Sequence, residues 1–379
     1  MSFSPDELTR YSRQFSIPEF GLEGQKRLQA GSVLCIGAGG LGSPAITYLA
    51  AAGVGKITIV DADRVEASNL HRQLLYTAAN VGQLKAEAAR ERVRQINPIV
   101  AVEIVPERFT VANAERLIST HDVVLDGSDN FATRYLSSDM AFWLKKPNIY
   151  GSILRFEGQA TVFAPHLGGP CYRCFLPTPP APGVVPTCAE SGVLGILPGI
   201  IGLIQATEAV KFLTGLGDSL AGRLVHFDAL AMRFREFKLR PDPACAVCGS
   251  APTISTPIDY EAFCGAADSC SMKTPEMTVH DLQQILQSPP ADFLLIDVRE
   301  AFERDIAMLP EAVWIPLGEI EARVDEIPRD KAIAVHCKAG GRSAKAVDFL
   351  RAKGYGNVKN VAGGINEWSK EIDPSVAWY

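Results

Sequence analysis

Short apolar runs alternate with longer helical stretches over the first 130 residues of the chain. The runs at 32–36, 56–60, 100–105 and 122–125 are rich in Val and Ile, which predicts buried strands. Helices are expected at 43–52 and 81–95, and Asn97-Pro98 ends the second. Strands that alternate with helices form a parallel sheet covered on both faces. The pattern therefore predicts a doubly wound, Rossmann-like α/β domain.

A second, smaller α/β pattern begins near residue 276. It comprises a helix at 279–286, strands at 293–297 and 332–336, and a helix at 343–353. The stretch before it lacks a periodic pattern and carries Pro252 and Pro257. We therefore expect a first domain over residues 1–250, a linker over 251–275 and a second domain over 276–379.

Composition removes several classes of function. The chain has 379 residues with 37 Lys+Arg against 43 Asp+Glu, a net charge of −6, so a general nucleic-acid-binding role is disfavoured. The most apolar stretch, 193–204, is too short for a membrane span and predicts a buried helix, or alternatively a dimer interface. No secretory signal is seen, and the nine cysteines are an odd number. We expect a cytoplasmic protein with thiols and metal ligands, without membrane or nucleic-acid partners.

The turn after the first strand has a glycine pattern typical of nucleotide sites. Gly37, Gly39 and Gly42 form GxGxxG between a strand and a helix, where backbone N–H groups can face a phosphate. Asp61 ends the next strand, where an acid can bind ribose hydroxyls. Taken alone, this pattern makes an NAD-dependent dehydrogenase the default, and a glycine turn without any ligand is the alternative.

Three further features favour a magnesium triphosphate over a dinucleotide. Two of them are basic residues, Arg72 and Lys85, and the third is Asp129, which follows the strand at 122–125. Each also has an ordinary explanation. Arg72 and Lys85 could be solvated surface charges, and Asp129 could cap the helix that follows it.

Cysteines provide three further signals. Two CxxC pairs can supply four thiolates to a closed tetrahedral zinc site, and their members are Cys171, Cys174, Cys245 and Cys248. Cys337 ends an apolar strand and opens a helix across a short turn closed by Arg342. Backbone N–H groups, the helix dipole and this cation would stabilise an anionic sulfur there, and the Cx4R spacing suits a persulfide. Cys188 follows a proline-rich loop and is a candidate second thiol.

Taken together, these residues resemble the MoeB/ThiF adenylating enzymes, which are bacterial relatives of ubiquitin-activating enzymes. Arg10-Tyr11-Ser12-Arg13-Gln14 also matches their RYxRQ motif. The resemblance implies that Arg13 reaches the ATP of a partner subunit in a homodimer. It implies ATP and Mg²⁺ binding by the following residues: Gly37, Gly39, Gly40, Gly42, Asp61, Ser68, Asn69, Leu70, His71, Arg72, Lys85, Asp129 and Asn130.

The second pattern resembles a rhodanese domain. Matching segments begin at Leu295, Val313, Cys337 and Gly363. The fused chain is similar to MoeZ-type and MOCS-type adenylyltransferase/sulfurtransferases. The resemblance implies adenylation of a small ubiquitin-fold sulfur carrier that ends in Gly-Gly, followed by sulfur transfer from a Cys337 persulfide to give a thiocarboxylate.

Several points stay open at this stage. The sulfur donor would be a cysteine desulfurase persulfide or thiosulfate. The carrier could serve molybdopterin, thiamine or cysteine synthesis, or tRNA thiolation. A dehydrogenase, and a non-catalytic scaffold that only gathers a carrier and a donor, are the alternative functions.

Overall fold

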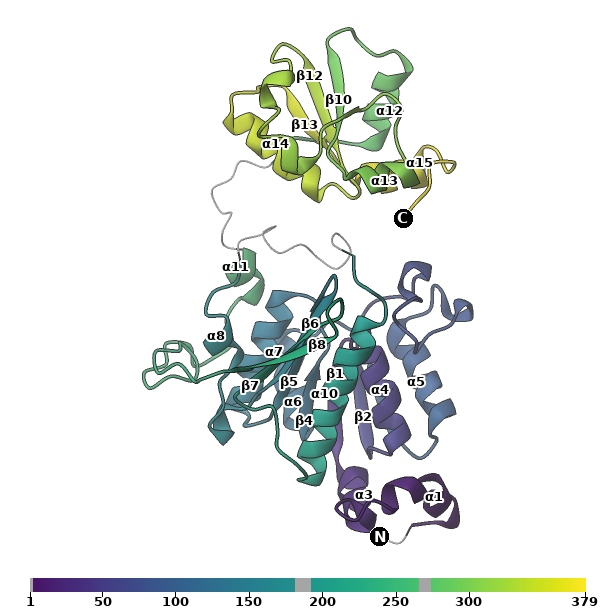
Figure 1. Ribbon diagram of the computed structural model, residues 1–379, viewed down its shortest axis with the longest axis vertical. Coiled ribbons are helices and arrows are strands. Elements are labelled where there is room, and N and C mark those ends of the chain that lie inside the picture. Colours follow the sequence, from purple (N-terminus) through teal and green to yellow (C-terminus); the bar gives the residue numbers. More distant parts are fainter. Residues whose placement is uncertain (1–2, 181–191, 266–273) are drawn as a thin grey trace. The chain divides into compact units, whose positions relative to one another are not determined.

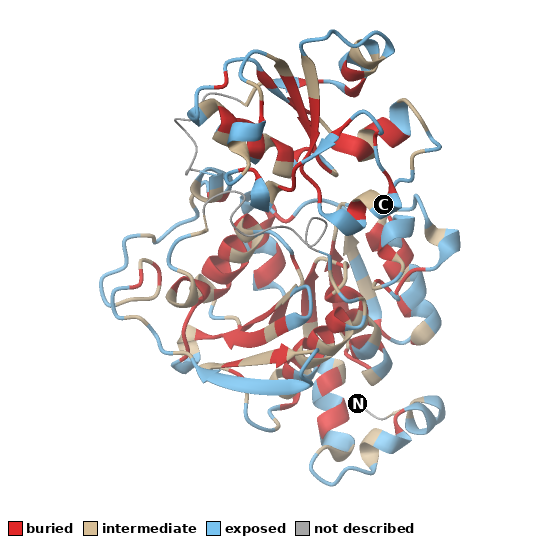
Figure 2. Cartoon of the chain, turned by 45° about the horizontal axis from the view of Figure 1, so that its top comes forward, coloured by how far each residue is buried: buried red, intermediate tan, exposed pale blue. Residues whose placement is uncertain are grey.

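The computed structural model describes residues 3–180, 192–265 and 274–379. The chain divides into two compact units, one over Met1–Ala267 and one over Asp268–Tyr379 (Figure 1). Figure 2 shows that buried residues follow the strands of each unit and the helix faces packed on them. Among the described residues, no helix has both the length and the apolar character needed to cross a membrane.

The first unit is built on an eight-stranded sheet with the order β3-β2-β1-β4-β5-β6-β7-β8. Its strands are β1 (Ser32–Ile36), β2 (Lys56–Val60), β3 (Ala101–Val105), β4 (Val123–Asp126), β5 (Asn148–Leu154), β6 (Glu157–Phe163), β7 (Arg223–Asp228) and β8 (Arg233–Lys238). Its helices are α1 (Pro5–Arg10), α2 (Ser12–Phe15), α3 (Gly21–Ala30), α4 (Gly42–Ala52), α5 (Lys85–Ile96), α6 (Val111–Ser119), α7 (Phe131–Trp143), α8 (Tyr172–Phe175), α10 (Leu197–Thr214) and α11 (Tyr260–Gly265).

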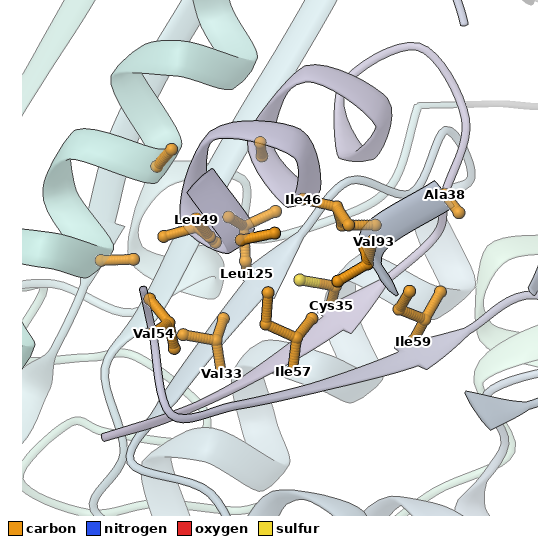
Figure 3. Packing of buried hydrophobic residues seen from close by; sticks show 14 of the residues in the cluster. Val33, Cys35, Ala38, Ile46, Leu49, Val54, Ile57, Ile59, Val93 and Leu125 are labelled. Atoms are coloured by element: carbon orange, nitrogen blue, oxygen red, sulfur yellow. The ribbon is translucent and has the colours of Figure 1, made fainter. Parts of the chain in front are cut away.

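Alternate residues of the central strand face two different cores, as the period of a strand requires. Val33 and Cys35 of β1 pack with α4 and α5, whereas Leu34 and Ile36 pack with α6 and α7. Figure 3 shows Cys35 among apolar side chains of the first core. Burial raises the pKa of this thiol to about 12, so Cys35 is a core residue.

The parallel sheet predicted from the sequence covers only half of the observed one. Strands β1 to β5 are parallel, but β6, β7 and β8 continue the sheet in antiparallel order. The reason is local: β5 and β6 form a hairpin with Leu154 paired to Glu157, so no crossover helix intervenes. The sheet is therefore mixed.

Two predicted helices differ from the observed ones. The helix expected at 81–95 is α5, which begins at Lys85 because Gly82 has φ +88° and its N–H bonds to Val65 O. The apolar stretch 193–204 lies mostly in α10, a longer helix. Leu197 and Ile201 of α10 are buried within the unit, whereas Leu194 and Ile196, which precede the helix, are 41% and 70% exposed, so only the helical part of this stretch contributes to the core.

Part of the segment expected as a linker packs on the first unit. Helix α11 lies in this segment, contacts α7, and buries Tyr260 and half-buries Phe263. The described portion up to Gly265 is therefore structured, because its aromatic side chains fill a core beside α7.

The second unit is a five-stranded parallel sheet with the order β11-β10-β12-β13-β9. Its elements are β9 (Glu276–Met277), α12 (Val279–Gln287), β10 (Phe293–Asp297), α13 (Ala301–Ile306), β11 (Val313–Trp314), β12 (Ala332–His336), α14 (Gly341–Ala352), β13 (Val358–Val361) and α15 (Gly364–Glu371). The central strand β12 delivers Cys337 to the carboxyl edge of the sheet, immediately before α14.

Candidate active sites

The glycine loop lies where the strand order of the first sheet reverses. Gly37 follows β1 with φ +88°, and a Cβ on Gly42 would lie 2.0 Å from Gly37 O, so both positions require glycine. Gly127, which follows β4, lies against Gly37. Since β1 and β4 are neighbours whose chains continue to opposite sides, this edge is the crevice where doubly wound sheets bind ligands. The N-terminus of α4 faces the same loop and favours a phosphate.

Asp61 holds the glycine loop at its first turn. Its Oδ2 accepts a hydrogen bond from Ala38 N at 2.8 Å, and its Oδ1 accepts one from Asp63 N at 2.9 Å. Burial raises the pKa of Asp61, while the nearby Lys85 acts in the opposite direction. The half-buried carboxylate lies at the end of β2, which suits contact with ribose hydroxyls.

Both predicted phosphate-binding cations lie beside this loop, and each already has an oxygen partner. Lys85 is buried, and its Nζ lies 2.8 Å from Asp63 Oδ2. Arg72 lies near Gly40 and donates from Nη2 to Asn69 Oδ1 at 2.7 Å. These contacts fix the directions of both side chains, so neither is the freely solvated surface charge of the ordinary explanation.

The rest of the 68–72 run has mixed surroundings. Ser68 donates its hydroxyl to Glu66 at 3.3 Å, and its carbonyl accepts from Arg72. Leu70 packs against the apolar core, and His71 is exposed. Within this run, the side chains of Asn69 and Arg72 are therefore the two that are hydrogen-bonded to each other beside the glycine loop.

Asp129 and Asn130 separate into two roles. Asn130 is the N-cap of α7, and its side-chain oxygen accepts from Thr133 N at 2.8 Å. The capping role considered for Asp129 thus belongs to its neighbour. Asp129 is exposed, and its carboxylate makes no hydrogen bond or ion pair with any residue the structure describes. A carboxylate at this edge without a protein partner suits a hydrated magnesium ion, which takes one or two carboxylates plus phosphate oxygens.

Two residues of this site escaped the sequence analysis. Gln73 is buried beside Gly39, and its Oε1 has no hydrogen-bond partner among the described residues. Tyr76 is also buried and donates its hydroxyl to Ala38 O at 2.9 Å. Gln73 directly follows Arg72 in the sequence, so it could have been predicted as part of the nucleotide site. The sequence gave no indication that Tyr76 belongs to the site, because a tyrosine in an apolar pattern is expected to be a core residue.

The four predicted zinc ligands come together. The Sγ atoms of Cys171, Cys174, Cys245 and Cys248 all lie within 4.8 Å of one another, with the closest pairs at 3.3 to 3.7 Å. A tetrahedral zinc with Zn–S bonds of about 2.3 Å separates its sulfurs by about 3.8 Å. No pair is close enough for a disulfide bond. The cluster is consistent with a structural zinc that has no open position.

Cys337 lies in a buried loop of the second unit. Its Sγ accepts from Gly340 N at 3.1 Å and from Ser343 Oγ at 3.3 Å. Gly340 has φ +96° and begins the turn into α14. Two donors and a helix N-terminus therefore face the sulfur, an arrangement that stabilises a thiolate or a persulfide anion.

Arg342, the cation expected to close this loop, is one member of an ion pair. Its Nη1 and Nη2 lie 2.5 and 2.6 Å from the two carboxylate oxygens of Glu303. Burial opposes ionisation of Glu303, but the ion pair with Arg342 lowers the pKa of Glu303 overall. Tyr379 also donates to Glu303, at 3.0 Å. Arg342 therefore braces the loop as half of an ion pair, a contact between residues 39 positions apart that spacing could not reveal.

Arg13 and Cys188 complete the set of predicted site residues. Arg13 of α2 is exposed and makes no side-chain hydrogen bond or ion pair within the described ranges. Cys188 lies outside the described residues.

Comparisons with known proteins agree with this two-part architecture. The ThiF family model matches residues 11–247 and the rhodanese-like domain model matches residues 278–371. A probable adenylyltransferase/sulfurtransferase MoeZ of Mycobacterium tuberculosis is 44% identical over all of this chain and 97% of its own length. The adenylyltransferase and sulfurtransferase MOCS3 of Drosophila ananassae is 41% identical over 99% of this chain and 86% of its own.

Two more relatives match the first unit. A sulfur carrier protein adenylyltransferase of Thermus thermophilus is 51% identical over 70% of this chain and 99% of its own. The crystal structure of Escherichia coli MccB with MccA-N7isoASN shares the fold, with a TM-score of 0.57, 19% identity, and coverage of 64% of this chain and 75% of that one.

A nucleotide-binding α/β unit with a four-cysteine cluster, joined to a unit built around a cysteine loop, defines an adenylyltransferase and sulfurtransferase that uses ATP. The chain belongs to the ThiF family and carries a C-terminal rhodanese-like domain. The dehydrogenase and scaffold alternatives are thereby set aside.

Proposed function

We propose that this enzyme adenylates the C-terminal carboxylate of a small ubiquitin-fold carrier ending in Gly-Gly and then replaces one carboxylate oxygen with sulfur. The single observation that carries the proposal is the edge of the first sheet, where the glycine loop, Arg72, Lys85 and the unpartnered Asp129 lie at the strand-order reversal. This edge offers what a triphosphate and its metal ion need.

In the adenylation step, a carboxylate oxygen of the carrier bonds to the α-phosphorus of ATP and the bond to pyrophosphate breaks. Asp61 orients the ribose, and the N–H groups of the glycine loop orient the phosphates. Arg72 and Lys85 offset the negative charge that develops on the leaving pyrophosphate. Asp129 would hold Mg²⁺, which neutralises phosphate charge when bound.

In the sulfur-transfer step, the terminal sulfur of a Cys337 persulfide attacks the acyl carbon and AMP leaves. Gly340 N–H and Ser343 Oγ–H donate to Cys337 Sγ and would favour the thiolate that accepts the sulfur, and the same turn and helix N-terminus would stabilise the anionic terminal sulfur before attack. The product is an acyl disulfide. We assign Cys188 the next step, in which its thiolate attacks the Cys337 sulfur, forms a Cys188–Cys337 disulfide and frees the carrier thiocarboxylate. An external dithiol then reduces the disulfide.

A second surface of the first unit, the outermost strand of its sheet, is the one that we assign to docking of the protein partner. Strand β8 is the outermost strand, and all six of its residues are exposed. Phe234 is 56% exposed and Met232, just before the strand, is 75% exposed. Four of the six residues of β8 are charged, which protects this edge from indiscriminate strand pairing, and the exposed apolar side chains among them offer a carrier a contact surface. A desulfurase persulfide or thiosulfate would load Cys337, in the cytoplasm, where thiols stay reduced.

The test uses the full chain with a panel of recombinant ubiquitin-fold proteins that end in Gly-Gly. Each is incubated with ATP, Mg²⁺ and thiosulfate, and ATP–pyrophosphate exchange and carrier mass are measured. We expect one carrier to support exchange and to exchange a terminal oxygen for sulfur. Cys337→Ala should retain exchange and lose the thiocarboxylate. Absence of carrier-dependent exchange across the panel would refute the proposal.

A further inference from the structure

The hydroxyl of Tyr379 links two ion pairs of the second unit. It accepts a hydrogen bond from Arg299 Nη1 at 2.8 Å and donates to Glu303 Oε1 at 3.0 Å. Arg299 is itself paired with Asp297 at 2.7 Å, and both of these residues are fully buried. Glu303 is paired with Arg342. In Figure 1 this end of the chain lies beside α13, the helix that carries Glu303. One hydroxyl therefore joins a buried ion pair to the ion pair of Arg342.

The carboxylate of Glu303 has no acceptor position left for a further cation. Its Oε1 accepts from Tyr379 and from Arg342 Nη2. Its Oε2 accepts from Arg342 Nη1 and from Glu300 N. A carboxylate offers about four acceptor positions, two on each oxygen. The Tyr379 hydroxyl thus fills the fourth position.

Lys338 is the other cation of the cysteine loop, which comprises residues 337–342. Its half-buried side chain makes no hydrogen bond or ion pair with any residue that the structure describes. Its Nζ lies 4.8 Å from the centroid of the Tyr379 ring, which is a cation–π contact. Burial lowers the pKa of Lys338, and Arg342 acts in the same direction, against the opposing effect of Glu303. The ring therefore holds a cation whose charge is not taken up by a carboxylate.

We propose that Tyr379 is a positioning residue for the loading of sulfur on Cys337, because it keeps Lys338 free to bind an anionic sulfane-sulfur donor. The inference rests on the proposed function, in which Cys337 carries the persulfide. In the loading step the Cys337 thiolate attacks the outer sulfur of a donor such as thiosulfate. The sulfur–sulfur bond of the donor breaks, and sulfite leaves with its electron pair. Lys338 attracts the negative charge of the donor, whereas Arg342 is already occupied by Glu303.

The binding role is tested by single-turnover loading of the full chain, reduced and freed of reductant, with excess thiosulfate. Released sulfite is measured at a series of thiosulfate concentrations. Lys338→Met should raise the half-saturating concentration about tenfold and leave the maximum rate unchanged, because the donor is charged both before and during the transfer. Lys353→Met is the matched control, since Lys353 Nζ also lies over a ring, 5.4 Å from that of Phe349, but outside the cysteine loop. Cys337→Ala gives the sulfite released at other cysteines.

The positioning role is tested by removing the hydroxyl and the ring of Tyr379 in turn. Tyr379→Phe frees one acceptor position on Glu303, which Lys338 can then occupy, so the half-saturating concentration should rise about threefold. Tyr379→Leu also removes the ring and should raise it about tenfold, as Lys338→Met does. Added to Lys338→Met, Tyr379→Leu should raise it no further, a result that a general loss of structure would not give.

Tyr355→Phe is the control for the loss of a tyrosine hydroxyl in this unit. Tyr355 donates to Ile327 O at 2.9 Å, and the Arg329 guanidinium lies 4.7 Å from its ring centroid. These contacts are of the same kind as those of Tyr379, but they involve no residue of the cysteine loop. The half-saturating concentration should therefore stay at the wild-type value.

The outcomes separate this inference from the proposed function. An unchanged half-saturating concentration in Lys338→Met overturns the inference, and so does a wild-type chain that thiosulfate does not load. A further rise when Tyr379→Leu is added to Lys338→Met overturns the positioning role. If Tyr379→Leu fails to fold, Tyr379→Phe decides, and a wild-type value there overturns it as well. Sulfite release in Cys337→Ala that equals the wild-type release refutes the persulfide on Cys337, and with it the proposed function.

Discussion

Two adjacent residues that follow β4 have different roles, one in the stability of the fold and one in the candidate active site. Asn130 is used by the fold, because its amide oxygen caps α7. Asp129, one position earlier, is left exposed beside the glycine loop. A charged group without a structural partner at a ligand-binding edge is a candidate for function rather than stability.

Replacing Asp129 should therefore remove adenylation and leave folding intact. In Asp129→Ala, carrier-dependent ATP–pyrophosphate exchange should fall by about 100-fold or more, since a metal-holding carboxylate contributes several kcal/mol at the transition state. The thermal unfolding temperature should stay unchanged. Asp218→Asn, at another exposed acid of the same unit, should leave both measurements unchanged. Near-native exchange in Asp129→Ala would contradict the assignment.

His336 predicts a pH dependence of stability in the second unit. Burial lowers its pKa to about 4, and Asp297, 3.8 Å away, only partly opposes this. In the unfolded chain the pKa is about 6.5. Between these two pKa values the unfolded state binds more protons than the folded state. The contribution of His336 to the free energy of unfolding is therefore fully present above pH 6.5 and decreases as the pH falls toward 4. The total decrease is about 3 kcal/mol.

The measurement is the unfolding free energy of the full chain between pH 7 and pH 4. His336→Gln should flatten the slope assigned to the second unit, whereas His280→Gln, at an exposed histidine of α12, should leave it as in the wild type. An unchanged slope in His336→Gln would show that another group carries the pH dependence.

At the scale of elements, the four-cysteine cluster joins two short segments that have little regular secondary structure to hold them together. Helix α8 has only four residues, and the segment that carries Cys245 and Cys248 contains no regular element. Short segments of this kind need a cross-link to stay ordered. Bound zinc would supply that link.

Cys171→Ser should therefore lower zinc content from one equivalent per chain to well below one, and lower the unfolding temperature of the first unit. Adenylation should decline only in parallel with the folded fraction, because a closed tetrahedral site leaves no position for substrate. Cys264→Ser, a half-buried cysteine outside the cluster, is the control. Full stability and full activity in zinc-free protein would argue against a structural metal.

At the scale of the whole molecule, Arg13 lies on α2 with no partner in the described part of its own chain. We expect a homodimer in which Arg13 completes the ATP site of the other protomer. Chains with Arg13→Ala and chains with Asp129→Ala should each be inactive in ATP–pyrophosphate exchange. Mixed dimers should regain up to half of the wild-type activity per dimer, because one of their two sites is intact.

Two controls make this complementation decisive. Subunit exchange between differently tagged chains shows that mixed dimers form, and Arg10→Ala, on the neighbouring helix α1, tests whether any lost N-terminal cation has the same effect. Exchanged dimers without activity would show that the site lies within one chain.

The sequence by itself determined the features that depend on neighbours along the chain. The glycine loop after β1, the cysteine loop after β12 and the alternation of strands and helices are local patterns, and the structure confirms the two-part α/β architecture. The two CxxC pairs could also be recognised from the sequence, because the cysteines of each pair lie within one turn of chain.

Only the tertiary structure decided which charges are paired. Glu303 pairs with Arg342, Asp63 with Lys85, and Asp139 with Arg173, which lies 34 positions along the chain. Such pairings follow from how strands and helices pack, since buried charges must find counter-ions wherever the fold brings them.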